Sequence, residues 1–262
     1  MDLGIRGRSA IINGGSAGLG FGTALALGGE GVNLFISARN EDRLQKACEK
    51  IRDATGARVE AIVADHATVE GRQRILDRCP DPDIFVGTCS PPPYIEDFRQ
   101  IGDADWRANL DMTFISPVEF IRSVVDGMCQ RGWGRILNIA TAAVKFPHPW
   151  RILSGAPRAA LVNYTVAVAR VVAPHGVTIN SLLPAMHDTD GIREIYGSRA
   201  AQKGNSLEEE IDEAIRTIGI PVGRFGSEID FGAIAAMFCS AQSNYITGQS
   251  LVVDGGFSNA TY

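Results

Sequence analysis

Short apolar runs alternate with amphipathic stretches from one end of the chain to the other. The apolar runs are rich in Val, Ile and Leu without regular polar alternation, which is typical of strands covered by helices on both faces. Most successive runs are far enough apart for a helical crossover, as parallel strands require. The expected strands are 9–12, 32–37, 58–63, 84–86, 135–139, 177–182 and 250–253. The expected helices are 19–30, 41–55, 69–78, 106–128, 159–172 and 231–239.

The domain organisation follows from the same pattern. No internal repeat, low-complexity tract or Pro/Ser-rich linker divides the 262 residues. We therefore expect an α/β protein of one domain, residues 1–262, with a single doubly wound Rossmann-type parallel sheet and helices on both faces. Residues 186–221, which contain an acidic helical stretch at 207–218, look like an insertion. We expect them to form a lid over the substrate, because insertions after strand ends often cover ligand sites.

Composition excludes several classes of function. Lys and Arg total 25 against 30 Asp and Glu, a net charge of −5, and no basic cluster stands out. Nucleic acid and anionic membranes are therefore not expected partners. The N-terminus has no signal-peptide pattern, and no segment approaches about 18 uninterrupted apolar residues, so we expect a soluble cytoplasmic protein. The five cysteines lack metal-ligand spacing, which favours reduced thiols and no bound metal.

A glycine-rich turn lies between the first expected strand and the first expected helix. Residues 13–20, Asn-Gly-Gly-Ser-Ala-Gly-Leu-Gly, place glycines where the backbone must turn sharply and approach a diphosphate. The helix that follows offers free N–H groups and a positive dipole end to the anion. This context predicts a dinucleotide-binding turn. The residues expected to contact the cofactor are Gly14, Ser16, Gly18, Leu19 and Gly20.

The end of the second expected strand indicates which nicotinamide cofactor is bound. A carboxylate about 20 residues after the glycines would accept the ribose hydroxyls of NAD. The chain instead has Ser37-Ala38-Arg39-Asn40. The planar guanidinium of Arg39 can clamp a 2′-phosphate, and Ser37 can add a donor. The sequence therefore favours NADP(H) over NAD(H).

The glycine turn and several later motifs resemble those of the short-chain dehydrogenase/reductase family, in the family's order and over nearly the whole chain. Asn13 and Ala185 stand where the family has Thr and Gly. The matching positions are Gly14, Gly18, Gly20, Asp65, Asn109, Pro184, Thr189 and the segment 246–256.

This resemblance implies roles for individual residues. Asp65 would contact the adenine, and Asn109 would support a proton-relay water. Pro184 and Thr189 would lie near the nicotinamide. The resemblance also implies a homo-oligomer, a tetramer or a dimer, that acts on a small-molecule substrate.

The resemblance breaks at the catalytic residues. Thr141 stands where the family has a serine, and its hydroxyl can still donate to a substrate oxygen. Ser154 occupies the position of the catalytic tyrosine, and Arg158 the position of the lysine. A serine hydroxyl ionises far less readily than a phenol, and arginine stays charged and cannot shuttle protons. We expect Ser154 to cap a helix N-terminus, with Pro157 in its first turn. Arg158 would hold ribose hydroxyls or an anionic substrate.

Two residues are candidates to replace the missing proton donor. The family's Asn-Asn-Ala-Gly after the fourth strand is replaced by residues 87–90, Gly-Thr-Cys-Ser, and Tyr94 follows on the same loop. His148 lies between Thr141 and Ser154, and histidine titrates near neutral pH. Each also has a purely structural interpretation, as a rim residue for Tyr94 and as a surface-loop residue for His148.

Three functions remain open from the sequence. The first is an NADP(H)-dependent oxidoreductase that acts on a small carbonyl/alcohol pair with a non-standard proton relay. The second is a lyase, hydrolase or isomerase in which Thr141 binds an oxyanion, Arg158 a negative charge, and His148 moves protons. The third is a non-catalytic NADP-binding protein.

Overall fold

A computed structural model describes residues 2–93, 95 and 97–258 of the chain. These residues form one sheet of seven parallel strands in the order β3-β2-β1-β4-β5-β6-β7. The strands are β1 (Ser9–Asn13), β2 (Asn33–Ala38), β3 (Val59–Val63), β4 (Ile84–Gly87), β5 (Gly134–Ile139), β6 (Val177–Pro184) and β7 (Ser250–Val253). The order reverses between β1 and β4, which is the arrangement expected of a doubly wound sheet.

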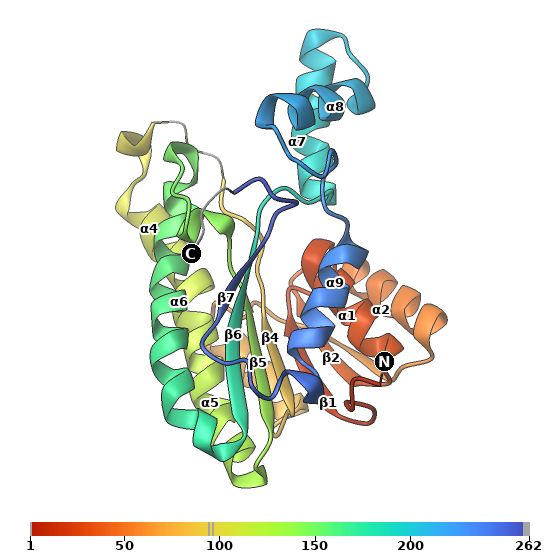
Figure 1. Cartoon of the computed structure of the whole chain (residues 1–262), viewed down its shortest axis with the longest axis vertical. Coiled ribbons are helices and arrows are strands. Elements are labelled where there is room, and N and C mark those ends of the chain that lie inside the picture. The colour runs from red at the N-terminus through yellow and green to blue at the C-terminus, as the bar shows by residue number, and fades with distance from the viewer. Residues whose placement is uncertain (1, 94, 96, 259–262) are drawn as a thin grey trace.

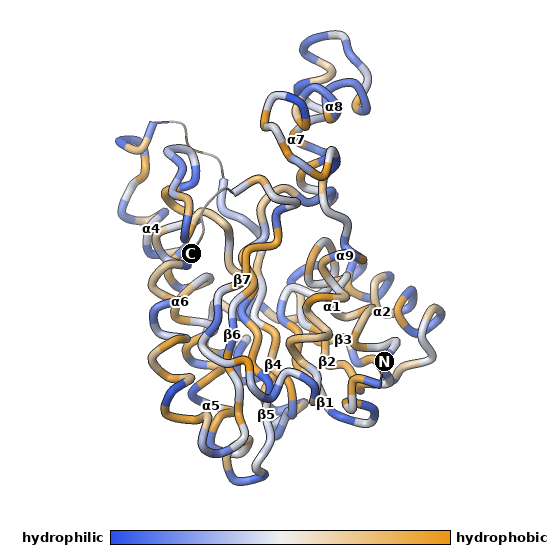
Figure 2. Tube along the Cα trace, in the orientation of Figure 1, coloured by the Kyte–Doolittle hydropathy of each residue, from blue (hydrophilic) through white to orange (hydrophobic). Residues whose placement is uncertain are grey.

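Helices cover both faces of this sheet (Figure 1). One face carries α1 (Gly18–Gly29), α2 (Glu41–Thr55) and α9 (Glu228–Phe238), which pack into a core cluster through residues such as Leu27, Leu44 and Phe231. The other face carries α3 (Val69–Arg78), α5 (Ser116–Arg131) and α6 (Ile152–Val172), which pack through Phe120 and Val124. Figure 2 shows the hydrophobic residues running along the strands between these layers. The expected fold class is confirmed.

The helix expected at 106–128 is interrupted. It consists of α4 (Asp103–Leu110), a π-helical turn at Asp111–Ile115, and then α5. Pro117, the second residue of α5, has no N–H for an intrahelical bond and follows directly after the wide turn. Such π turns often lie near functional sites.

The segment expected to be a lid forms α7 (Asp190–Lys203) and α8 (Leu207–Ile218). Figure 1 shows this helical pair standing beyond the carboxyl ends of the strands, away from the sheet. The two helices hold a small hydrophobic cluster of their own around Tyr196, Ile220 and Phe225. The pair is therefore packed through this cluster, to which the residues that follow α8 contribute Ile220 and Phe225.

Within the described part of the chain, no helix has the length and hydrophobicity needed to cross a bilayer.

Candidate active site

The carboxyl ends of β1 and β4 meet where the strand order reverses, the usual ligand crevice of such sheets. Gly14 follows β1 with φ of 66°, and a Cβ on it would lie 3.0 Å from the carbonyl oxygen of Thr88, which follows β4. The N–H of Gly14 donates to the carbonyl of Ser37, at 2.9 Å. Only glycine fits this position without strain.

The glycine turn leads into α1 with the geometry that a diphosphate needs. Ala17 precedes the helix and makes no side-chain cap, and no acidic residue lies in the first turn. A Cβ on Gly20 would lie 2.4 Å from the carbonyl oxygen of Gly14, so the turn closes directly against the helix. A Cβ on Gly18 would lie 3.3 Å from the methyl group of Thr189. The structure thus brings Gly14, Gly18, Gly20 and Thr189 together around an uncapped helix N-terminus, which fits a bound diphosphate.

Glu228, which no sequence pattern singled out, also lies at this end of α1. Burial and the nearby negative charge of Asp190 raise the pKa of its carboxyl, and a hydrogen bond with the backbone N–H of Gly18 opposes that shift.

Of the two residues expected to bind the 2′-phosphate, only Arg39 is accessible. Arg39 is exposed immediately after β2. Ser37, by contrast, is fully buried, and its hydroxyl donates to Oδ1 of Asn13 at 2.9 Å. The structure therefore corrects the expectation for Ser37. The chain becomes exposed only at Arg39, after the buried Ala38. Asp65 is half-buried after β3, and its carboxylate accepts a hydrogen bond from the N–H of Ala67 at 3.0 Å.

Replacing Arg39 by Ala should weaken NADPH binding by about 10- to 100-fold, the effect of losing a charge-assisted hydrogen bond. NADH, which lacks the 2′-phosphate, should bind as before. Calorimetric titration with both nucleotides measures the difference. Arg58→Ala is the matched control, since Arg58 is exposed at the opposite end of β3. Equal losses for NADPH and NADH would show that Arg39 does not recognise the phosphate.

Thr141 lies just beyond β5, at the carboxyl edge of the sheet. Its oxygen accepts a hydrogen bond from the N–H of Ala143 at 3.4 Å, which leaves the hydroxyl proton available. A half-buried threonine in this place can donate to an oxygen of a bound substrate.

Ser154 does not cap α6. The helix begins at Ile152, so Ser154 is its third residue and is only 4% exposed. Its hydroxyl accepts from Nη1 of Arg158 at 3.0 Å, and Nη2 of Arg158 donates to Sγ of Cys89, also at 3.0 Å. Ser154, Arg158 and Cys89 therefore form one connected group that joins α6 to the loop after β4.

Asn109 explains why α6 can start before its proline. Pro157 is the sixth residue of the helix, not part of its first turn, and it has no N–H to offer the carbonyl of Leu153. Nδ2 of Asn109 donates to that carbonyl instead. The main-chain carbonyl of Asn109 accepts from the hydroxyl of Thr113 at 2.7 Å. The side chain of Asn109 thus supports α6 directly.

A second polar contact supports the same helix. Nδ2 of Asn138 on β5 donates to Oγ1 of Thr165 on α6, at 3.0 Å. Oδ1 of Asn138 is buried without a partner among the described residues, and a Cβ on Gly87 would lie 3.1 Å from it. These contacts hold α6 in place although the family's asparagine pair after β4 is absent.

Of the two candidate proton donors, the structure describes His148 and not Tyr94. His148 is exposed before α6, where Nδ1 accepts from the N–H of Trp150 at 3.4 Å and the two rings meet edge to face. It lines neither of the pockets beside Ser154 and Arg158. His148 is thus a surface residue beside Trp150, which lines the first of these pockets. Tyr94 lies outside the described residues.

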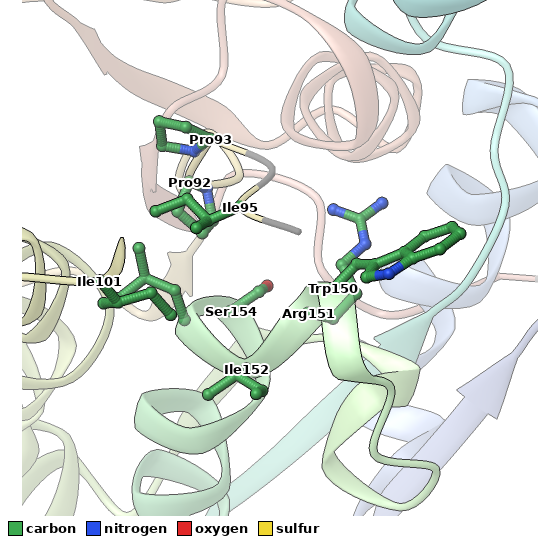
Figure 3. Close-up of a pocket in the computed structure, with 9 residues that line it drawn as sticks. Pro92, Pro93, Ile95, Ile101, Trp150, Arg151, Ile152 and Ser154 are labelled. Atoms are coloured by element: carbon green, nitrogen blue, oxygen red, sulfur yellow. The ribbon is translucent and has the colours of Figure 1, made fainter. Parts of the chain in front are cut away.

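Two pockets flank this group. The first lies at the start of α6 and is shown in Figure 3, where the hydroxyl of Ser154 points into it and Ile152 points away. It is lined by Pro92, Pro93, Ile95, Ile101, Trp150, Arg151, Ile152, Leu153 and Ser154. The second lies between the ends of β1 and β4 and the π turn, and includes Asn13, His66, Cys89, Thr113, Ser116 and Arg158.

His66 is the member of the second pocket that local sequence could not place. It is 7% exposed, and its Nδ1 lies 2.8 Å from Oγ of Ser116. Burial, together with the positive charges of Arg39 and Arg72, lowers its pKa from 6.5 to about 4, and Asp65 opposes the shift. His66 is therefore neutral at physiological pH. No cluster of metal-ligating side chains appears among the residues with defined positions.

Comparison with known proteins now decides the family. A family model described as "Enoyl-(Acyl carrier protein) reductase" matches residues 14–258. The chain is a short-chain dehydrogenase/reductase. This match confirms the resemblance seen in the sequence. The family consists of NAD(P)-dependent oxidoreductases.

Individual relatives extend this result. The NADPH-dependent reductase BacG of Bacillus subtilis is 29% identical over 254 residues, which cover 95% of this chain and 97% of BacG. The acetoacetyl-CoA reductase of Cupriavidus necator is 28% identical, with 95% and 97% covered. Among solved structures, L-sorbose reductase from Gluconobacter frateurii in complex with NADPH and L-sorbose superposes with a TM-score of 0.94 at 25% identity, covering 99% of this chain and 100% of that one.

Proposed function

We propose that this chain is an NADP(H)-dependent oxidoreductase of a small carbonyl/alcohol pair, with a non-standard proton relay. The observation that carries the proposal is the shared edge of the sheet on which the glycine turn, Arg39 and Thr141 lie. The NADPH named for BacG and for L-sorbose reductase supports the choice of cofactor. A bound nicotinamide would supply hydride transfer, and the protein orients the reactants.

The residues of the site have separate roles in this proposal. The glycine turn and the end of α1 hold the diphosphate, and Arg39 holds the 2′-phosphate. Thr141 donates a hydrogen bond to the substrate oxygen. Ser154 cannot act as the acid that a tyrosine would be, because its hydroxyl ionises too weakly. Since a positioned acid contributes about 10²- to 10⁴-fold, we expect slow turnover or a substrate that needs little acid catalysis.

Substitution of Thr141 tests the proposal. Thr141→Val keeps the shape but loses the hydroxyl, and should lower kcat/KM for NADPH-dependent carbonyl reduction by about 100-fold, as loss of a single donor to a developing oxyanion does. Thr141→Ser keeps the hydroxyl and should stay within several-fold of the wild type. The measurement is loss of nicotinamide absorbance over a panel of carbonyl compounds.

Other outcomes of this panel contradict the proposal. Substrate turnover without a change in nicotinamide absorbance would indicate lyase, hydrolase or isomerase chemistry. Tight NADPH binding without turnover of any carbonyl would indicate a binding protein. Equal activity of Thr141→Val and the wild type would remove Thr141 from the site.

Two further features belong to the same proposal. The helical pair α7–α8 is the segment that would cover bound substrate, because Thr189 at its start already faces Gly18 of the cofactor turn. The chain would assemble as a tetramer or dimer through α5 and α6, where Val166 and Val171 are exposed on α6. We propose a cytoplasmic location.

A further inference from the structure

Arg158 is a buried positive charge without a negative partner. Among the described residues, its side chain donates to the carbonyl and hydroxyl of Ser154 and to the sulfur of Cys89. Throughout the described residues, no carboxylate comes within ion-pair distance of it. Removing an unpaired charge from water costs several kcal/mol, so an anion at this place would be strongly favoured.

Arg135, which is also deeply buried, is an arginine whose guanidinium has several oxygen acceptors within the protein. Arg135 donates to the carbonyl oxygens of Gly134, Gly176 and Ser240 and to the side-chain oxygen of Asn244. Its guanidinium also stacks over the ring of Trp133, 4.5 Å from the centroid. Arg158 has no such set of oxygens, and a thiol is a weak acceptor. Arg158 therefore has fewer oxygen acceptors than Arg135.

The hydroxyl of Ser154 links the guanidinium of Arg158 to the pocket at the start of α6. Because Oγ accepts from Nη1 of Arg158, its own proton remains free to donate. Figure 3 shows the hydroxyl pointing into the pocket, below Pro92 and Ile95 in this view. An anion there would receive a hydrogen bond that the charge behind it strengthens.

The electrostatic character of the two pockets agrees with an anionic ligand. Among the described residues, neither pocket is lined by an Asp or Glu, whereas Arg158 lines the second. The remaining lining of the first pocket is mostly apolar, with Pro92, Ile101 and Trp150 among its residues.

We propose that the substrate is an oxo acid with an apolar body, whose carboxylate binds the hydroxyl of Ser154 with Arg158 behind it. This inference rests on the proposed function and names its substrate class. The apolar body would lie against the proline loop and Trp150. Ser154 and Arg158 are then residues for specificity, in the places where the family has its proton donor and lysine.

The test compares an oxo acid with its neutral ester. With NADPH, the wild-type enzyme should reduce phenylpyruvate with a kcat/KM about 10- to 100-fold above that for methyl phenylpyruvate, the range expected for one charge-assisted hydrogen bond. Arg158→Gln and Ser154→Ala should lower the ratio of acid to ester toward one. Arg158→Lys, which keeps the charge, should retain part of it. Arg170→Gln removes a charge from an exposed position on the same helix and should leave the ratio unchanged.

The ratio separates specificity from a general role of Arg158. If Arg158 only held the cofactor ribose, its variants would slow acid and ester equally, and the proposal would fail. It would also fail if the wild type did not distinguish the two compounds. Reduction of both at equal rates would leave the redox function intact.

Binding measurements cover the case in which neither compound is reduced. Thermal unfolding of the NADP⁺-loaded protein with phenylpyruvate and with its ester reports binding alone. Protection by the acid only, lost in Arg158→Gln, would support the anion site while the redox proposal falls. Absence of protection by the acid would overturn the anion site.

Discussion

Gly20→Ala should lower the affinity for NADPH by up to about 100-fold. The new methyl group would lie 2.4 Å from the carbonyl oxygen of Gly14 and 2.9 Å from the methyl group of Thr88, both of which would have to move. Overpacking of this kind costs about 1–3 kcal/mol, and here the displaced backbone is the turn that surrounds the diphosphate. Calorimetry or fluorescence titration of NADPH measures the loss.

The matched control is Gly29→Ala in the same helix. A Cβ on Gly29 meets nothing within 4 Å, and alanine is the better helix former by about 0.5–1 kcal/mol. This variant should bind NADPH as the wild type does and unfold at the same or a slightly higher temperature. If Gly20→Ala also bound NADPH normally, the diphosphate would have to lie elsewhere, and the proposed function would lose its support.

Acidification should destabilise the protein through His66. Its pKa is about 4 in the folded state against an ordinary 6.5, because burial disfavours the charged ring. Below pH 6.5 the unfolded chain binds a proton that the folded protein does not, so stability falls as the pH falls. The loss extends from about pH 6.5 to about pH 4 and amounts to about 3 kcal/mol, with no further contribution below.

Denaturant unfolding at a series of pH values measures this effect. In His66→Gln the slope of the free energy of unfolding against pH should be shallower in that window, whatever the variant's stability at neutral pH. A residual slope is expected from His187, whose pKa burial also lowers. His175→Gln, at an exposed position after α6, is the control and should keep the wild-type slope. An unchanged slope in His66→Gln would show that His66 takes up its proton as readily folded as unfolded.

Much of the fold was predictable because local signals agree with the packing. The bounds of α2 and α3 match the expected 41–55 and 69–78. Asn40 and Thr68 accept hydrogen bonds from the first turns of these helices, at 2.8 and 3.0 Å, and Gly56 ends α2 with φ of 69°. Capping residues of these types mark helix ends in the sequence itself.

The start of α6 was not predictable for the opposite reason. Gly155 and Pro157 are local helix breakers, so the sequence predicted a regular helix only from 159, with Ser154 as a cap and Pro157 in the first turn. The structure continues it back to Ile152 because Asn109, from another helix, satisfies the carbonyl that the proline leaves free. The partner lies 44 residues away, and no local pattern records it.

The sequence by itself determined the sheet, the family, the glycine turn and the loss of the catalytic tyrosine and lysine. Each depends on residue type and short-range spacing. Only the tertiary structure decided that Ser37 is buried against Asn13, that His148 is exposed, and that Arg158 meets Cys89, 69 residues earlier in the chain. Burial, and contacts between residues distant in sequence, depend on how the helices pack, which residue spacing does not encode.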